Sequence, residues 1–187
     1  MFSTGYAGGV MRKLYYSHMQ SPAGRLKLAV SDRGLAVLEF AGTTLTPCKA
    51  ELRAEWVDAP EQTASHRRQL EEYFAGQRRQ FDFPLDLAGT PFQLRCWQEL
   101  LRIPYGETIS YAELARRVGS PNGFRAVGMA NHQNPIAIVV PCHRVLASDG
   151  TLGGYGGGLP VKRMLLDLEQ RVSGTSCRAL DQQEMFA

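Results

Sequence analysis

Cys142 is the residue of this chain whose type and neighbours point most directly to chemistry. It follows the apolar run 136–140 and Pro141, and His143 and Arg144 come directly after it. A cysteine reacts as its thiolate, and a neighbouring base or positive charge lowers the cost of forming that thiolate. The segment therefore indicates a reactive nucleophile. A buried structural cysteine beside a surface histidine is the alternative that this local pattern leaves open.

His143 can serve Cys142 only if the extended segment has ended, because adjacent side chains of a strand point to opposite faces. Pro141 provides such an end. A third group is then needed to orient the imidazole. Glu169, in the last helical segment, is the best candidate for this role, although spacing alone does not establish that it reaches His143.

The other cysteines, Cys48, Cys96 and Cys177, are widely separated, and no Cys-x-x-Cys pair occurs. We therefore expect neither a zinc site nor a disulfide framework. Cys96 lies among apolar residues that recur at helical spacing, which is typical of a small buried hydrophobe.

The composition is ordinary for a soluble globular protein, with 44% hydrophobic and 21% charged residues in a chain of 187. A net charge of +3 permits nucleic-acid binding without requiring it, because such binding needs only a local basic face. No apolar run is long enough to span a bilayer, and residues 1–10 do not resemble a signal peptide. We expect a cytoplasmic protein with reduced thiols and no membrane association.

The first part of the chain predicts an antiparallel meander followed by a helix and a short strand. The corresponding segments are Leu14–His18, Gly24–Val30, Leu35–Phe40, Glu61–Ala75 and Phe81–Phe83. Gly76 is suited to the position just after the helix. No chemistry is apparent in this part.

The second part predicts helices around one buried strand. A helix begins at Thr90-Pro91 and continues to Arg102, and Ser110 with Glu113 has the spacing of a capping box that opens a helix through Val118. The remaining segments are a helix over Phe124–His132, a buried strand over Ile136–Val140 and a final helix from Pro160. The two short helices joined by a turn fit a helix-turn-helix, a pattern that many helical hairpins share. The fold class is thus α/β (α+β), with domains at 1–88 and 89–187.

Three stretches of the second part closely resemble the methylated-DNA–protein-cysteine methyltransferases, which repair O6-alkylguanine by direct reversal. They are Pro104-Tyr-Gly-Glu-Thr-Ile-Ser-Tyr111, Asn134-Pro followed by the apolar run and Pro141-Cys-His-Arg-Val145, and Gly154-Tyr-Gly-Gly-Gly-Leu159. The resemblance covers nearly the whole chain and is strongest from Pro91 to Gln170. It implies an RNase H-like N-terminal domain and a C-terminal domain that carries the helix-turn-helix and the alkyl acceptor.

The resemblance also implies a mechanism. The damaged nucleotide is rotated out of the duplex, His143 takes the thiol proton through a water, and Cys142 attacks the alkyl carbon. Glu169 orients the imidazole, Tyr111 crowds the target phosphate and donates a proton toward the departing guanine, and Asn134 braces the turn before the cysteine. The product is a thioether, so the protein acts once and needs no cofactor.

The family binds the minor groove of double-stranded DNA through the helix-turn-helix. Arg125 matches the arginine that fills the gap left by the flipped base, whereas an exposed helix arginine and a core tyrosine are the plainer interpretations of Arg125 and Tyr111. Small residues allow close approach to the DNA, namely Gly123, Ala126, Gly128 and Ala130. The substrate pocket is expected to involve Pro141, Val145, Tyr155 and Gly156. The chain is expected to be monomeric when free.

Two positions depart from the commonest family pattern. Gly156 stands where serine or alanine is frequent, and Phe124 is a large residue beside Arg125 that either packs inward or adds an apolar wedge against the minor groove. The ligands of the zinc-binding branch do not align near the N-terminus, so we expect no metal. A four-cysteine N-terminal sensor module is absent, so we expect no transcriptional control by self-methylation. A module that binds the lesion without repairing it, and a cysteine hydrolase, are the rival functions. The presence of Cys142 favours repair over a module that only binds the lesion. The glycine-rich segment 153–158 is a separate question, and it lacks the spacing of a phosphate-binding loop.

Overall fold

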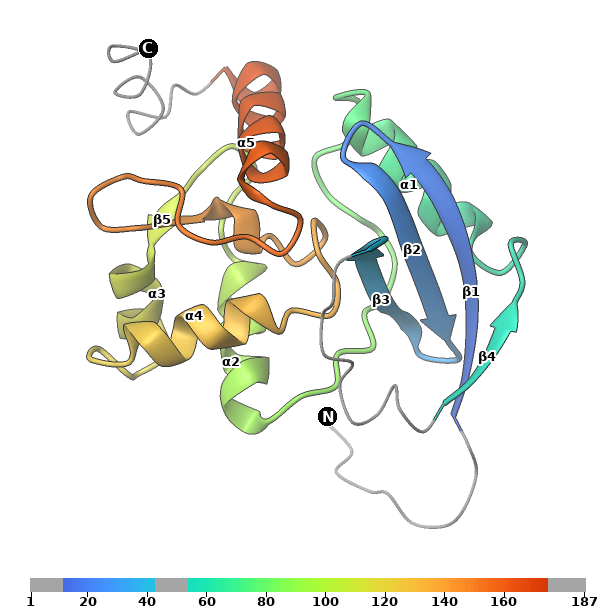
Figure 1. Ribbon diagram of the computed structural model, residues 1–187, viewed down its shortest axis with the longest axis horizontal. Helices are drawn as coiled ribbons and strands as arrows, with labels where there is room; N and C mark the ends of the chain where they lie inside the picture. Colours follow the sequence, from blue (N-terminus) through green and yellow to red (C-terminus); the bar gives the residue numbers. More distant parts are fainter. Residues whose placement is uncertain (1–11, 43–53, 175–187) are drawn as a thin grey trace.

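The structure is a computed structural model that describes residues 12–42 and 54–174. A sheet packed against one helix forms the N-terminal half, and short helices form the C-terminal half beside it (Figure 1). Cys48, Cys177, residues 1–10 and the tail after Gly174 lie outside the described residues. Among the described residues, no helix is long and apolar enough to cross a membrane.

The N-terminal half contains a four-stranded sheet with the strand order β3-β2-β1-β4. Its elements are β1 (Arg12–Ser21), β2 (Gly24–Ser31), β3 (Gly34–Phe40), β4 (Ala54–Asp58) and α1 (Ala64–Phe74). The first three strands pair antiparallel through tight turns, which confirms the predicted meander. Gly76, just after α1, has a positive φ of 73° and ends that helix as expected.

Two details of this half differ from the prediction. Strand β4 was not anticipated and pairs in parallel with β1, so the sheet is mixed rather than wholly antiparallel. Its five residues are only partly buried or exposed, so they lack the apolar alternation that marked the other strands. The short strand predicted at Phe81–Phe83 was wrong: the Asp82 amide donates to the Gln69 side chain rather than to a neighbouring strand, and a single bridge forms at Leu85.

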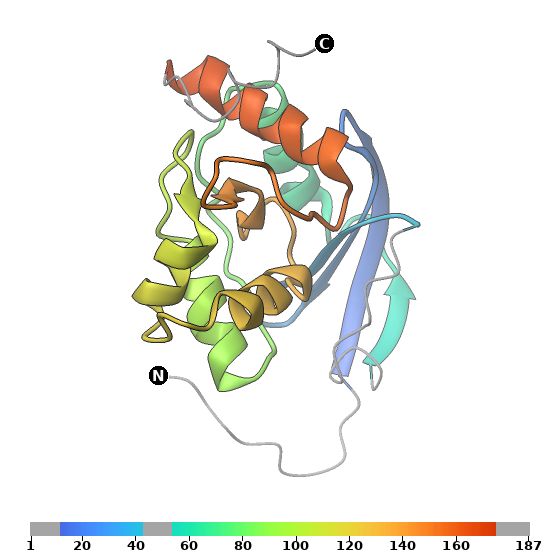
Figure 2. The ribbon, with the colours of Figure 1, turned by 60° about the vertical axis from the view of Figure 1, so that its left-hand side comes forward.

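The C-terminal half is built around three short helices and a long final one. Its elements are α2 (Pro91–Leu100), β5 (Ile109–Ser110), α3 (Tyr111–Arg117), α4 (Phe124–His132), a single 3-10 turn (Cys142–Arg144), β6 (Val145–Leu146) and α5 (Leu159–Ser173). In Figure 2, α5 lies across one end of this half, α3 and α4 lie at the other, and the 3-10 turn is held between them. The predicted helix pair α3–α4 is therefore present.

Helix starts follow local hydrogen bonding. Thr90 accepts from the Gln93 backbone while the Gln93 side chain accepts from the Thr90 backbone, a full capping box. The capping box predicted at Ser110 is only half formed. Ser110 does accept from the Glu113 backbone, but the Glu113 carboxylate is drawn away by ion pairs with the arginines at 116 and 117.

The apolar run Ile136–Val140 is not the strand that was predicted. It is buried, but it makes one bridge to Leu38 and then turns, with the Val140 amide donating to the Ile136 carbonyl. Ile138 has a φ of +70°, which is rare for a β-branched residue. A continuous apolar run reports burial, and it cannot distinguish a strand from a buried turn.

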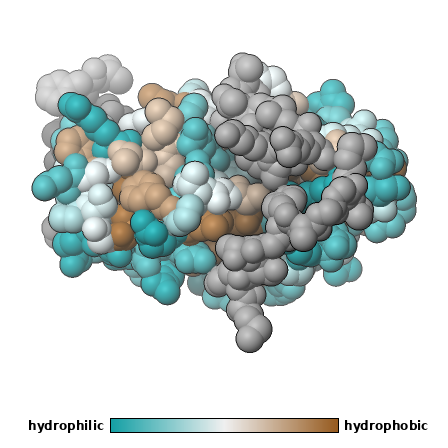
Figure 3. Space-filling model, turned by 90° about the horizontal axis from the view of Figure 1, so that it is seen from below, coloured by the Kyte–Doolittle hydropathy of each residue, from teal (hydrophilic) through white to brown (hydrophobic). Residues whose placement is uncertain are grey.

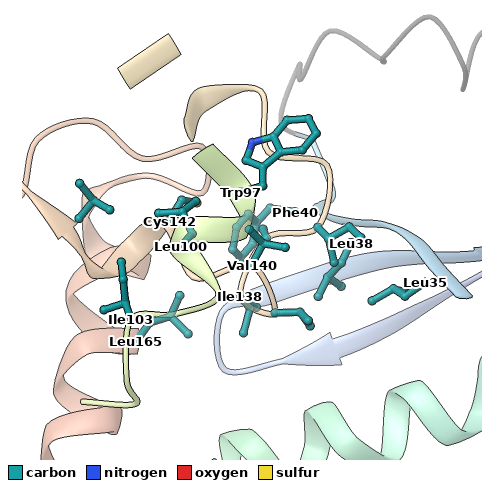
Figure 4. Close-up of a cluster of buried hydrophobic side chains, with 14 of the residues drawn as sticks. Leu35, Leu38, Phe40, Trp97, Leu100, Ile103, Ile138, Val140, Cys142 and Leu165 are labelled. Carbon is teal, nitrogen blue, oxygen red and sulfur yellow. The ribbon is translucent and has the colours of Figure 1, made fainter. Parts of the chain in front are cut away.

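One hydrophobic core joins the two halves. Leu38 and Phe40 of the sheet, Trp97 and Leu100 of α2, and Cys142 belong to the same buried cluster (Figure 4). The Trp97 indole, 1% exposed, donates to a backbone carbonyl of α4 at 2.9 Å. Because the core is shared, the sheet supports the segment that carries Cys142.

Candidate active site around Cys142

Cys142 begins the 3-10 turn and opens onto a cleft of about 670 Å³, although the residue is only 8% exposed. The cleft is lined by Tyr111, Ala112, Phe124, Gly128, Asn131, His132, Cys142, Ala147, Ser148, Gly154, Tyr155 and Gly156. These residues come from α3, α4, the 3-10 turn and the loop before α5. A buried sulfur at the wall of a cleft of this size can react only with a group that enters the cleft.

Asn134 fixes the backbone before the cysteine. Its side-chain nitrogen Nδ2 donates to the Val140 carbonyl at 2.8 Å and lies 3.3 Å from the Cys142 sulfur, while Oδ1 accepts from the Ile136 amide. Asn134 thus makes hydrogen bonds to both ends of the Ile136–Val140 turn. Burial raises the pKa of the Cys142 thiol, and the Asn134 hydrogen bond opposes this by stabilising the thiolate.

His143 and Glu169 are both fully buried and in direct contact. Nε2 of His143 donates to Oε1 of Glu169 at 2.9 Å. Glu169 therefore does reach His143, which the sequence spacing alone did not establish. The other ring nitrogen, Nδ1, has no hydrogen-bond partner among the described residues. With Nε2 carrying the proton, Nδ1 is the basic nitrogen. Burial lowers the pKa of His143, and the Glu169 carboxylate partly offsets that effect.

Glu169 is the centre of a buried network. Besides His143 it accepts from Arg144 through Nε (2.8 Å) and Nη2 (2.9 Å), from the Gly106 amide (3.1 Å) and from the Tyr73 hydroxyl (2.7 Å). Burial alone would raise the pKa of Glu169, but His143 and Arg144 together hold it well below its usual range. The carboxylate therefore stays ionised beside the imidazole.

Two parts of the network were not foreseen. Arg144 was considered as a positive neighbour of the thiol, but its guanidinium is committed to Glu169 and to the Ile103 carbonyl. Tyr73 comes from α1 of the N-terminal half, in which no chemistry was expected. A tyrosine hydroxyl in a core usually has a partner, and that rule was the available signal for Tyr73.

Lys162 is a fully buried lysine that sequence reasoning also missed. Its Nζ donates to the carbonyls of Val145 and Leu152, and it lies 5.9 Å from the centre of the Tyr111 ring. Burial lowers its pKa to about 8. Lys162 and Glu169 are seven residues apart on α5 and so share one face, a spacing that would have placed both toward the core.

The predicted pocket residues divide into two groups. Tyr155 and Gly156 line the cleft, and the Tyr155 ring contacts the rings of His143 and Phe40 edge-on. Pro141 and Val145 are buried but are not part of the cleft wall. The Val145 carbonyl accepts a hydrogen bond from the Lys162 ammonium group.

Tyr111 and Phe124 border the cleft from the two short helices. Tyr111 is the first residue of α3, and burial raises the pKa of its hydroxyl. Phe124, the first residue of α4, is 52% exposed, so it does not pack inward. Arg125 is exposed beside it, with its guanidinium carbon 5.9 Å from the Phe124 ring centre.

The small residues expected at the outer surface of the helix pair differ in their positions. Ala126 is exposed, but Ala130 is 2% exposed and faces the core, which corrects its assignment to a DNA-facing surface. At Gly123 a Cβ would lie 2.2 Å from the Ser120 hydroxyl oxygen and 3.0 Å from the Ser120 carbonyl oxygen, so the turn leaves little space for a side chain there. At Gly128 a Cβ would meet nothing within 4 Å.

Hydrophobic residues gather on the side of the helical half when the molecule is seen from below (Figure 3). On α4, Phe124 and Met129 are 52% and 56% exposed, respectively.

Within residues 12–42 and 54–174, no group of three or more histidine, cysteine, aspartate or glutamate side chains could hold a metal ion.

Comparison with known proteins gives the same family for both halves. Residues 14–87 match the ribonuclease-like domain of 6-O-methylguanine DNA methyltransferase, and residues 91–171 match its DNA-binding domain. A methylated-DNA–protein-cysteine methyltransferase of Mycolicibacterium paratuberculosis is 48% identical over 89% of this chain and 98% of its own. Its namesake from Methanosarcina barkeri is 45% identical over 84% of this chain and 98% of its own.

Among solved structures, the Mycobacterium tuberculosis OGT in complex with DNA superposes with a TM-score of 0.77 at 46% identity. The match covers 84% of this chain and 94% of that one. Two domain matches that together span most of the chain, and relatives matched over nearly their full length, lead to one conclusion. The chain belongs to the 6-O-methylguanine DNA methyltransferase family.

Proposed function

We propose that this chain repairs DNA by moving the alkyl group of O6-alkylguanine, and to a lesser extent that of O4-alkylthymine, irreversibly onto the sulfur of Cys142. The observation that carries the proposal is the placement of that sulfur at the wall of a cleft of about 670 Å³, backed by Asn134 and by the buried His143–Glu169 pair. The family names of the relatives support the same reaction.

The residues divide the reaction among themselves. His143, whose Nδ1 is the unprotonated nitrogen, takes the thiol proton through one water, and Glu169 orients and offsets the imidazolium. The Cys142 sulfur attacks the alkyl carbon in line, so an S–C bond forms as the C–O bond breaks. The electron pair passes to the guanine, which accepts a proton from the Tyr111 hydroxyl.

The product is a thioether, and this reaction needs no cofactor. Nothing in the sequence offers a route back to the thiol, so each molecule acts once. Asn134 holds the turn that presents the sulfur, through its bonds to the Val140 carbonyl and to the sulfur itself. The same nitrogen stabilises the thiolate once the proton has left.

We propose that α3 and α4 bind double-stranded DNA through the minor groove. A base inside a duplex cannot reach a buried sulfur, so the target nucleotide must leave the stack. Arg125 fills the vacated space, an assignment that its exposure at the start of α4 supports. Phe124 beside it is exposed and borders the cleft, which fits an apolar wedge that holds the duplex open.

The proposal also includes the oligomeric state and the location of the protein. The protein is a monomer when it is not bound to DNA, and it acts in the cytoplasm, where thiols are kept reduced. Its contacts to DNA are mainly to the backbone, so binding is expected to be salt-sensitive and to show little sequence preference.

Mass measurement tests the reaction directly. After incubation with duplex DNA that contains O6-methylguanine, the intact chain should gain one methyl group on the Cys142 peptide and stop at one equivalent. Cys142→Ser should gain none, whereas Cys96→Ala, which removes a cysteine buried in the core, should still be methylated. An unmodified chain that binds the DNA would refute repair and favour a lesion-binding module. Repeated turnover of an ester or amide would favour a hydrolase.

A further inference from the structure

Asn131 is a buried amide without a partner. It lies in the last turn of α4 and is 7% exposed, and neither its Nδ2 nor its Oδ1 makes a hydrogen bond to any described residue. Asn134, three residues later, uses both of its polar atoms. Buried polar groups in folded proteins are nearly always satisfied, so an unsatisfied amide calls for a functional explanation.

The position of Asn131 connects it to the cleft. Phe124, Gly128 and Asn131 follow each other at helical spacing on one face of α4, and all three line the cleft that also holds Cys142. Exposure falls from 52% at Phe124 to 7% at Asn131, so the amide lies at the inner end of this row. Gly128, between them, leaves open space where a side chain would otherwise stand.

An amide group offers a donor and an acceptor side by side. The edge of O6-alkylguanine that carries the 2-amino group offers the complement, since that amino group donates and the ring nitrogens N1 and N3 on either side of it accept. O4-alkylthymine offers only acceptors, N3 and O2, along its corresponding edge. An amide at the inner end of the cleft can therefore satisfy both of its polar atoms with the guanine and only one with the thymine.

We propose that Asn131 is a specificity determinant that turns its amide into the cleft and recognises the amino-bearing edge of the alkylated guanine. This inference rests on the proposed function, since it names the base that the Cys142 cleft prefers. It assigns to the guanine the hydrogen bonds that the free protein leaves unmade. A site built to bond a polar group rejects analogues that lack the group, because its own polar atoms are then left unpaired.

The test compares wild type with Asn131→Leu, which keeps the number and branching of the side-chain heavy atoms and removes the amide. Single-turnover rates of methyl transfer are measured on duplexes with O6-methylguanine or O4-methylthymine. The variant should lose about tenfold to a hundredfold in rate on guanine and much less on thymine. Met129→Ala, an exposed residue of the same helix outside the cleft wall, is the matched control and should leave the guanine-to-thymine ratio unchanged.

Two further readouts separate recognition from a structural role. The melting temperature of Asn131→Leu should equal or exceed that of wild type, because the Asn131 side chain makes no hydrogen bond to the described residues and a buried unsatisfied group is removed. The rate at which iodoacetamide modifies Cys142 should be unchanged. A lower melting temperature, a slower thiol reaction, or equal losses on the two duplexes would each overturn the inference.

The outcomes for the inference and for the proposed function are distinct. If wild type transfers methyl groups and Asn131→Leu keeps the wild-type guanine-to-thymine ratio, the inference fails and the proposed function stands. If wild type transfers no methyl group from either duplex, the proposed function fails and the inference fails with it.

Discussion

Replacing Glu169 by glutamine removes one negative charge from the centre of the buried network and changes little else in shape. Arg144, whose side chain is 10% exposed, then loses its anionic partner, and the new amide turns a donor toward groups that are themselves donors. Removing one partner of a buried ion pair typically costs about 3–5 kcal/mol. For a chain of 187 residues this corresponds to a fall of roughly 6–20 °C in melting temperature.

The same substitution has a defined pH dependence. Because the pKa of Glu169 is held well below 4.5 in the folded protein, the ionised carboxylate stabilises the fold fully above about pH 4.5. That stabilisation is lost as the pH falls from 4.5 toward the folded-state pKa, since the unfolded chain takes up the proton first. The gap in unfolding free energy between wild type and Glu169→Gln should therefore narrow between about pH 5 and pH 3.

Urea denaturation at several pH values measures both effects. Glu72→Gln is the matched control, because Glu72 also pairs with two arginines, Arg68 and Arg78, but at the surface, where such pairs contribute about 0–1 kcal/mol. If Glu169→Gln and Glu72→Gln had the same denaturation midpoint at pH 7, or if the gap stayed constant down to pH 3, the reasoning about the buried network would be refuted.

Three other changes have expected outcomes. Arg125→Ala should slow transfer from duplex DNA far more than transfer from the free alkylguanine base, and equal losses would remove Arg125 from base flipping. Burial lowers the pKa of His143 below 6.5, so protonation of the unfolded chain makes the fold less stable as the pH drops below 6.5. The unfolding free energy of His143→Gln, measured by urea denaturation at several pH values, should therefore fall less steeply with decreasing pH in this range than that of wild type. An unchanged pH dependence would contradict this expectation. Gly157→Ala should cost about 1–3 kcal/mol, because its Cβ would lie 2.8 Å from the Phe40 ring, whereas Gly154→Ala should cost little in the same assay; similar midpoints for the two variants would refute the packing argument.

The elements that could be predicted from the sequence are those with a local signal. Thr90 and Pro91 mark a helix start by chemistry within four residues, and the strands up to Phe40 are marked by their turns. Strand β4 depends on a partner strand about forty residues earlier, and its own residues carry no strong pattern. The turn at Ile136–Val140 was missed because a continuous apolar run reports burial alone. Its Ala137 amide bonds to Leu38 of another element, whereas the Val139 and Val140 amides bond back to Ala137 and Ile136.

The candidate site divides in the same way. Cys142, His143 and Asn134 lie within nine residues of each other, so their pattern was visible in one segment. The hydrogen bond from Tyr73 to Glu169 joins residues 96 positions apart, and no motif in the sequence around Tyr73 predicts Glu169 as its partner. The burial of Lys162 depends likewise on carbonyls that only the folded chain brings together.

The Tyr73 hydroxyl has a consequence for how the protein is organised as a cooperative unit. The carboxylate that orients the imidazole is completed by a donor from the N-terminal sheet-and-helix half, while the thiol belongs to the other half. Neither half holds the whole acid–base assembly, so separation of the halves would strip a donor from Glu169 and expose the core shared by Leu38 and Cys142. If the proposed roles of His143 and Glu169 hold, reactivity at the sulfur depends on the association of the two halves, and a molecule in which they separate should lose it.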